Sequence, residues 1–278
     1  MITLEDALLK GRGKWRSFHC PVHGDNSPSA RVNSENGWWV CMSCGAKGHA
    51  KNYVADPDKV ARSIIELLDQ TEMDPKPESW YDIFDSGPVC DHWLSRFSEA
   101  ACRHFRLGFD TSTGLPCYPV RNHRGEIVGI VRRDPEGKPK YKYPEHFPAS
   151  HLLWGAHEID HLPNNVPSGV GVKTLVITEG ATDVVACWDA GFYAVGTYGA
   201  VLHGDQLTQI AAFNPDLVLL AYDMDEAGIK GAKRAMEGLS TLGFWTVRAR
   251  WDGGKDLNDL DVETRRETLL HAIDTSRL

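Results

Sequence analysis

The sequence predicts a multi-domain protein: a small N-terminal β unit, then a mixed α+β block, then an α/β block with a central parallel sheet. Three observations support this fold class. The length of 278 residues suits two or three small domains. Residues 1–52 are rich in Trp, Cys, His and Gly and contain short alternating runs. Beyond residue 173, apolar strand-like runs alternate with helical stretches.

Composition excludes several classes of protein. No run of about 18 apolar residues is present, so we expect no membrane span. Seven irregularly spaced cysteines do not fit a disulfide scaffold and favour the reducing cytoplasm. The net charge is −8, yet basic residues outnumber acidic ones over 1–52 and 101–150. This pattern is typical of a chain that binds a polyanion with some segments and metal ions with others, although chance variation of surface charge gives a similar profile.

Two joints are predicted before residue 173. Apolar spacing predicts a helix over 56–70, and the acidic, proline-containing stretch 69–88 is interpreted as a linker. Strands are predicted at 117–121 and 126–133, joined by a turn at 122–125. The second joint is the Pro- and Gly-containing stretch 161–172.

The second half is predicted to contain four βα units. Four such units in a row predict a parallel sheet covered by helices. The expected strands are 174–178, 194–197, 217–222 and 244–251, and the expected helices are 182–190, 204–213, 227–242 and 259–273.

Four residues near the N-terminus have the spacing of a zinc site. Two C-x-x-ligand pairs can close one tetrahedral Cys₃His site, and a glycine after each pair supplies the tight turn. Metal binding would supply folding free energy that so small a segment lacks. His19 and His49 are nearby competitors, and chance spacing is the remaining alternative. The predicted ligands of this single structural Zn²⁺ are Cys20, His23, Cys41 and Cys44.

The same segment contains residues suited to nucleic acid. Arg31 can meet phosphates and Trp38 can stack on bases, so both are candidate contacts with nucleic acid. The alternative for the tryptophans of this segment is packing in its thin core.

Acidic residues follow three of the four predicted strands. Glu179 and Asp183 follow the first strand, Asp223 and Asp225 the third, and Asp256 the fourth. Since the carboxyl ends of parallel strands meet at one sheet edge, these carboxylates are expected to converge. They would stay ionised only with bound cations, and oxygen ligands suit Mg²⁺ or Mn²⁺. Helix caps and solvated loop acids are the alternative, and a P-loop is absent.

In this order, the motifs C-P-x-H, C-x-x-C, T-E-G-x-x-D, D-x-D and K-D-x-N-D resemble those of bacterial and phage DnaG-type DNA primases. The resemblance spans roughly residues 15–260 and includes a middle block around Tyr118-Pro-Val-Arg121 and Pro139-Lys140-Tyr141. It implies a zinc-binding ribbon over 1–55, a helix and linker over 56–88, a basic subdomain over 89–160, and a Toprim catalytic subdomain over 161–278. The compact length is similar to phage or mobile-element versions.

The resemblance implies template-directed synthesis of short RNA primers on single-stranded DNA from ribonucleoside triphosphates. Catalysis would then depend on Glu179, Asp223 and Asp225, and two or more Mg²⁺ or Mn²⁺ ions would be held by these three with Asp183 and Asp256. Nucleotide and template would contact basic residues of the middle block. These are Arg121, Arg133, Lys140 and Lys142.

Two departures from the family pattern stand out. A lysine expected before Leu153-Trp154-Gly155 falls near Ala149, and the usual K-D-P-D becomes Lys255-Asp256-Leu-Asn258. No helicase-binding bundle follows residue 278, so we expect stand-alone action or a separate replicative helicase, and no membrane partner. The alternatives are a non-catalytic zinc–Toprim recombination mediator and a metal-dependent Toprim nuclease.

Overall fold

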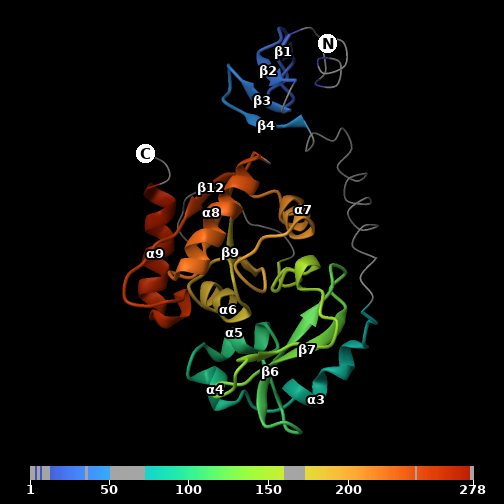
Figure 1. Cartoon of the computed structure of the whole chain (residues 1–278), viewed down its shortest axis with the longest axis vertical. Helices are drawn as coiled ribbons and strands as arrows, with labels where there is room; N and C mark the ends of the chain where they lie inside the picture. The colour runs from blue at the N-terminus through green and yellow to red at the C-terminus, as the bar shows by residue number, and fades with distance from the viewer. Residues whose placement is uncertain are drawn as a thin grey trace. The chain divides into compact units, whose positions relative to one another are not determined.

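The computed structural model describes Leu4, Ala7 and residues 13–34, 37–50, 73–159, 173–241 and 243–275. These residues form two units, which we describe separately. The N-terminal unit contains one four-stranded sheet and the larger unit contains two (Figure 1). One sheet of the larger unit is antiparallel, and the other pairs its strands in parallel where the register is defined. The predicted multi-domain fold class is therefore confirmed.

The N-terminal unit is an antiparallel meander with the strand order β1-β2-β3-β4. The side chains of Phe18, Val32 and Trp39 fill its core, and the rings of Phe18 and Trp39 meet edge to face with centroids 5.6 Å apart. Such a core is small, as expected for a unit that relies on a metal. Its strands are β1 (Trp15–Phe18), β2 (Ala30–Asn33), β3 (Trp38–Cys41) and β4 (Lys47–His49).

The first sheet of the larger unit is antiparallel, with the order β5-β6-β7-β8. Its centre is the predicted hairpin: β6 and β7 pair from Cys117 opposite Arg132 to Arg121 opposite Ile127. Short helices precede it and a 3₁₀ turn follows it. The elements are η2 (Glu78–Trp80), α3 (Asp82–Asp85), α4 (Asp91–Leu94), α5 (Glu99–His104), β5 (Gly108–Asp110), β6 (Leu115–Arg121), β7 (Ile127–Arg133), β8 (Tyr141–Lys142) and η3 (Ala149–His151).

The acidic stretch interpreted as a linker over 69–88 is folded in its described part, so that prediction is wrong for residues 73–88. The Lys76 amide donates to the carbonyl of Ile127, which attaches the segment to β7. Tyr81 is fully buried against Ile127, and Trp80 and Phe84 pack beside it. Aromatic burial thus outweighs the polar composition. The predicted helix at 56–70 and the predicted joint at 161–172 lie outside the described residues.

The second sheet of the larger unit has the order β10-β9-β11-β12. Strands β10 and β11 both run parallel to β9, and all residues of β9, β10 and β11 are buried. Predicted and observed bounds agree within one to three residues at most ends, although β12 ends at Arg248 rather than residue 251. The elements are β9 (Thr174–Thr178), α6 (Ala181–Asp189), β10 (Ala194–Gly196), α7 (Gly204–Ala212), β11 (Leu217–Ala221), α8 (Glu226–Thr241), β12 (Trp245–Arg248), η4 (Leu257–Asp259) and α9 (Val262–Thr275).

The strand order of this sheet creates a topological switch point, where the connections from two neighbouring strands run to opposite sides of the sheet. The chain leaves β9 toward β10 on one side and later returns to β11 on the other side. Because crossovers between parallel strands are right-handed, α6 and α7 cover opposite faces of the sheet. The loops after β9 and β11 therefore diverge, and such a crevice at the carboxyl ends of the strands is where open α/β sheets bind ligands.

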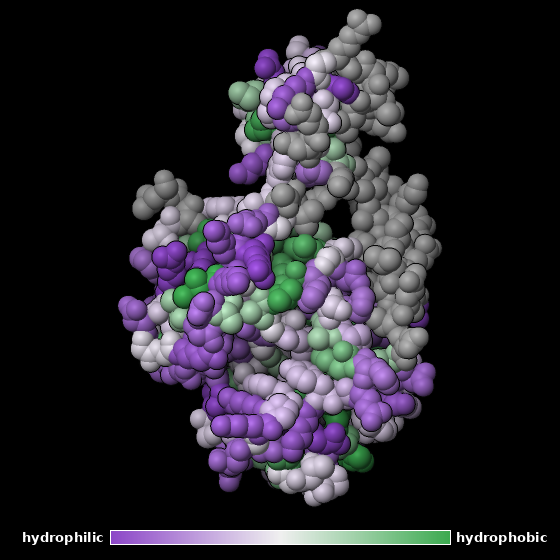
Figure 2. Space-filling model, in the orientation of Figure 1, coloured by the Kyte–Doolittle hydropathy of each residue, from purple (hydrophilic) through white to green (hydrophobic). Residues whose placement is uncertain are grey.

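Trp154 joins the two sheets of the larger unit. Its backbone pairs in both directions with Gly196 of β10, at 3.0 and 2.9 Å, and its indole Nε1 donates to the carbonyl of Pro119 in β6 at 3.0 Å. The basic hairpin is thereby fixed relative to the α/β sheet. None of the helices within the described ranges is long and apolar enough to cross a membrane. The visible surface of the larger unit is mostly hydrophilic, with an apolar area between α7 and α8 (Figure 2).

Candidate functional site

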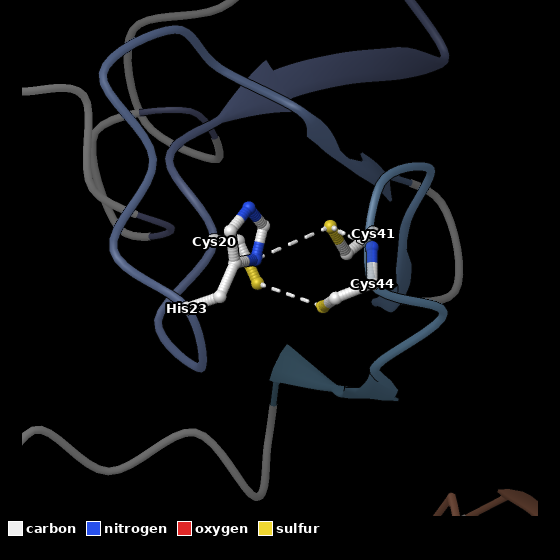
Figure 3. A group of neighbouring side chains, drawn as sticks. All are labelled: Cys20, His23, Cys41 and Cys44. Carbon is white, nitrogen blue, oxygen red and sulfur yellow. Dashed lines mark hydrogen bonds between the residues drawn. The ribbon is translucent and has the colours of Figure 1, made fainter.

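The four predicted zinc ligands meet at one point in the N-terminal unit (Figure 3). All of their ligand atoms lie within 4.8 Å of one another. The Cys20 Sγ–Cys44 Sγ distance is 3.7 Å and the Cys41 Sγ–His23 Nδ1 distance is 3.8 Å. A tetrahedral zinc with bonds of about 2.3 Å to sulfur requires an S–S edge of about 3.8 Å. The geometry therefore fits one structural Zn²⁺.

Each half of this zinc site has the same turn. The amides of Gly24 and Gly45 donate to the carbonyls of Cys20 and Cys41, and both glycines have positive φ, at +59° and +72°. A side chain would be strained there. The repeated turn points the two ligands of each pair toward the same metal position.

Asp25 and Ser29 form hydrogen bonds with two of the zinc ligands. Asp25 accepts hydrogen bonds from the Cys20 and Ser29 amides at 3.0 and 2.8 Å, and the Ser29 hydroxyl lies 3.3 Å from the Cys41 sulfur. Burial raises the pKa of Cys41, but hydrogen bonds led by that from Ser29 outweigh it and bring the pKa to about 6. Cys41 is therefore suited to bind metal as a thiolate.

Carboxylates gather at the switch point of the parallel sheet. Glu179 directly follows β9, and Asp223 lies two residues beyond the end of β11. The Asp223 amide donates to Glu179 Oε1 at 3.1 Å, so the two strand ends are in direct contact. Burial, followed by the charge of Asp223, raises the pKa of Glu179 to about 7. Burial also raises the pKa of Asp223.

Asp183 and Asp256 extend this group of carboxylates. Asp183 lies in the first turn of α6 and is 6% exposed, and Asp256 is the N-cap residue that precedes η4. Burial, followed by the charge of Asp256, raises the pKa of Asp183 well above its ordinary value, and burial, followed by the charge of Asp259, raises the pKa of Asp256. Oδ1 of each is buried without a hydrogen-bond partner among the described residues. Buried carboxylate oxygens without a partner are suited to bind a cation.

A lysine bridges the outer pair of aspartates. Lys255 Nζ lies 3.2 Å from Asp223 Oδ2 and 3.1 Å from Asp225 Oδ2. Asp225 also accepts the Gly228 amide at 2.9 Å, and this bond, followed by that from Lys255, lowers its pKa. A positive charge is thus already present between two of the carboxylates.

The first turn of α8 packs directly against these carboxylates. A Cβ atom at Gly228 would lie 2.3 Å from the Asp223 carbonyl oxygen and 2.6 Å from Glu179 Oε1. Position 228 therefore admits only glycine, because backbone atoms cannot give way to a side chain. The close approach aims the positive end of the α8 dipole at the acidic group.

A basic cluster from the hairpin and the preceding loop faces the carboxylates. Arg133 is 3% exposed, and its Nη1 lies 2.8 Å from Nε2 of His92. Burial, then Arg133, lowers the pKa of His92 to about 4, so His92 is neutral at neutral pH. Burial and Arg133 also lower the pKa values of Arg96 and Lys140, while Asp183 and Asp256 act in the opposite direction on both. The Nε atoms of Arg96 and Arg133 are buried and have no described partner.

Arg96 and His92 were not predicted from the sequence. His92 lies in the short helix α4 and Arg96 in the turn after it, with no motif around either, and only the folded chain places them beside Arg133. A crowded set of cations with unsatisfied donors opposite unsatisfied carboxylates is typical of a site for an anion and a metal together.

The other predicted basic residues lie differently. Arg121 lies at the opposite end of the β6–β7 hairpin from Arg133 and pairs with Glu78 at 2.7 Å and Glu158 at 3.7 Å. Lys142 pairs with Asp134 at 2.8 Å. Their predicted contacts with nucleotide stay predictions. The same holds for Arg31 on the exposed side of β2, and for Trp38, whose ring meets His49 edge to face.

The donor set at the switch point fits divalent cations. Carboxylate oxygens are the preferred ligands of Mg²⁺ and Mn²⁺, and two of them are buried and unsatisfied here. The zinc group is the described cluster that could hold an ion as it stands. For Asp223 and Asp225 to bind a metal ion with the same oxygen atoms, the ammonium of Lys255 would have to move away from them. A separate cavity of about 90 Å³, lined by residues such as Phe84, Cys102 and Leu107, is apart from these groups.

Two family models match the chain, each over one of these sites. Residues 3–79 match the CHC2 zinc finger, which includes the four zinc ligands. Residues 176–261 match a Toprim-like model, which includes the carboxylates after β9 and β11. The DNA primase of Deinococcus radiodurans is 24% identical over 90% of this chain. The domain plan is that of the DnaG-type primases.

Solved DnaG-type primases have the same fold as this chain. The zinc-binding and RNA polymerase domains of the Aquifex aeolicus primase superpose over 95% of this chain and 79% of theirs, with a TM-score of 0.55 and 18% identity. The RNA polymerase domain of Mycobacterium tuberculosis DnaG covers 80% of this chain, and this chain covers 84% of it, with a TM-score of 0.54 and 20% identity. The chain spans about half, 53%, of the Deinococcus primase.

Proposed function

We propose that this chain synthesises short RNA primers on a single-stranded DNA template, from ribonucleoside triphosphates. The observation that carries the proposal is the pairing of two unsatisfied groups within one unit. The buried, unpartnered Oδ1 atoms of Asp183 and Asp256 lie close enough to Arg96 to interact electrostatically with it, and the Nε atoms of Arg96 and Arg133 are also buried without a described partner. A metal–triphosphate complex carries both of the charges that such a site requires.

The carboxylates are assigned to two or more divalent ions, Mg²⁺ or Mn²⁺. Glu179, Asp223 and Asp225 would be ligands at the reacting centre, with Asp183 and Asp256 beside them. When bound, the metals supply Lewis-acid polarisation of the phosphoryl oxygens. The chain contributes position and charge: the backbone contact between Asp223 and Glu179 fixes the spacing of the two strand ends.

The basic cluster is assigned to the phosphates of the nucleotide and of the template strand. Arg96 and Arg133 are held by burial and offer unsatisfied N–H donors, and Lys140 adds an exposed ammonium. Preorganised donors of this kind stabilise charge without reorganisation cost. Neutral His92 contacts Arg133 without competing for the anion, because its pKa is about 4.

The zinc-bearing unit is assigned to template recognition. Arg31 is exposed on β2, and Trp38 is half buried at the start of β3. An exposed guanidinium and an indole are suited to a phosphate and a base. We also propose that the protein acts in the cytoplasm. A separate replicative helicase is a proposed partner.

The test is incorporation of labelled ribonucleotides on single-stranded DNA with Mg²⁺ or Mn²⁺. Asp223→Asn removes the carboxylate charge that pairs with Lys255 and leaves the backbone hydrogen bond to Glu179 in place. We expect incorporation to fall by at least about 100-fold, as for loss of a group that stabilises the transition state. Asp252→Asn is the matched control, because Asp252 is an exposed carboxylate before η4. It should retain full incorporation.

Two outcomes would overturn the proposed activity, and a third would overturn the assignment of Asp223. Metal-dependent cleavage of the template without polymerisation would indicate a nuclease. Binding of DNA with no product under either metal would indicate a non-catalytic mediator. Retained incorporation in folded Asp223→Asn protein would remove Asp223 from the reacting centre.

A further inference from the structure

Four aromatic rings form a continuous ladder in the larger unit. The ring centroids of Tyr143 and Phe147 lie 4.8 Å apart with the planes nearly parallel, at 23°. Tyr198, in the loop after β10, meets Phe147 edge to face at 4.8 Å. Tyr141 lies 6.4 Å from Tyr143 on the other side. We call these residues the aromatic ladder.

The inner end of the aromatic ladder lies at the proposed reaction site. The Arg133 guanidinium sits over the Tyr141 ring, 5.8 Å from its centroid. The Tyr141 hydroxyl is 3.4 Å from Oγ1 of Thr182, the neighbour of Asp183 in the first turn of α6. The ladder thus starts between the basic cluster and the carboxylates.

The exposed ring of the aromatic ladder is that of Tyr143, which lies between Tyr141 and Phe147. Tyr143 is 43% exposed, which makes it one of the largest exposed apolar groups in the described chain. Its ring is nevertheless held, because Phe147 stacks against it and Tyr198 closes the far side. A ring that is fixed from behind loses little entropy when a planar ligand stacks on it.

We propose that Tyr143 is a stacking platform for a base of single-stranded DNA whose phosphates lie along Arg133 and Lys140. This inference rests on the proposed function and adds a contact that the motifs of the sequence do not assign. Two properties of the surface select this ligand. The cations require a polyanion, and a flat apolar ring one step outward from them suits an unpaired base.

Stacking on an aromatic side chain does not depend on base identity, since every base has a π face. The platform would therefore hold the template without selecting its sequence.

The experiment measures binding of a labelled single-stranded oligonucleotide to the zinc-loaded 278-residue chain by fluorescence anisotropy, with Ca²⁺ replacing the catalytic metal and at several salt concentrations. We expect Tyr143→Ala to weaken binding roughly 5- to 10-fold with an unchanged salt dependence, whereas Tyr143→Phe stays within about twofold. Lys140→Gln should instead reduce the slope of log K against log salt by about one. Ile83→Ala removes an exposed apolar side chain elsewhere in the unit and should change nothing.

A strand with abasic sites provides the decisive comparison. On a fully abasic strand, the difference between the wild type and Tyr143→Ala should disappear, because no base is left to stack. A persistent difference would show that the substitution acts through structure and would overturn the inference. Equal affinity of Tyr143→Ala and wild type for the normal strand would also overturn it, provided that Lys140→Gln weakens binding. Absence of DNA binding by the wild type would instead refute the proposed function.

Discussion

Lys255 takes the position between two aspartates that a divalent cation requires. Its ammonium contacts Asp223 and Asp225 at 3.2 and 3.1 Å, although its side chain is 60% exposed. The interaction partly compensates the repulsion between the two carboxylates in the metal-free chain. It also competes with the metal, because the same oxygen atoms cannot bind both.

Lys255→Met is expected to tighten the binding of Mn²⁺ and to destabilise the metal-free protein. An exposed ion pair is worth little, so the gain in affinity should be about two- to fivefold. Electron paramagnetic resonance of free Mn²⁺ measures the affinity, and thermal unfolding without added divalent metal measures the stability. Lys230→Met, an exposed lysine of α8, is the control. Weaker Mn²⁺ binding by Lys255→Met would contradict this assignment.

The segment from η2 to α3 shows how acidic residues act at the level of an element. Arg106 contacts Asp82 at 2.8 Å and Asp85 at 2.6 Å, and it also pairs with Glu78. Arg121 pairs with Glu78 from the other side. These charges neutralise the segment while Tyr81 is buried beneath it, so an acidic stretch packs where composition suggests a linker.

Glu78→Gln is expected to lower the free energy of unfolding at pH 7 by roughly 1 kcal/mol, a modest value because solvent screens this half-exposed carboxylate. The hydrogen bond from Arg121, aided by Arg106, lowers the pKa of Glu78 to about 2. Its contribution is therefore complete above the unfolded pKa near 4.5 and is lost as pH falls toward 2. Urea unfolding of both proteins at pH 7 and pH 3 should show the difference shrinking.

Glu99→Gln is the matched control for this effect. Glu99 pairs with Arg103 at 2.8 Å, but both side chains are more than half exposed. Its removal should change stability by less than about 0.5 kcal/mol. Equal losses for the two variants would contradict a special role of the Glu78 network.

For the larger unit as a whole, Trp154 couples the hairpin to the α/β sheet. Trp154→Ala should lower the free energy of unfolding by about 3–5 kcal/mol. The substitution should destabilise both the antiparallel sheet and the α/β sheet. Hydrogen exchange should show that amides of β6 and β10 lose protection together. Trp251→Ala is the control: it removes another buried indole, which has no described partner for its Nε1. Undisturbed exchange in β6 of Trp154→Ala would contradict the coupling.

Local patterns predicted the parts of the molecule that depend on short spacings. The zinc ligands come from two turns of four residues each, so their convergence needs only one hairpin to be correct. Carboxylates that end parallel strands are placed by sheet topology, which predicted the contact of Asp223 with Glu179 before their distance was known. Both predictions followed from backbone geometry rather than side-chain packing.

Local patterns do not predict which residues far apart in the sequence pack together. Arg96 and His92 join the basic cluster because their segment folds onto the end of β7, some forty residues later in the chain. The stretch 73–88 was assigned by its charge, although Trp80, Tyr81 and Phe84 carried the opposite signal. Where charge and aromatic content disagree, the buried ring area decides.

The close packing at Gly228 fixes the spacing of the acidic residues at the strand ends. Because the α8 backbone rests directly on the strand-end loops, the spacing of the acids is transmitted by main chain and not by replaceable side-chain packing. The outer surface of α8 can accept new residues without moving the reacting centre. Mutational tolerance should thus change abruptly within one helical turn, from free variation on the solvent side to a single permitted residue facing the acids.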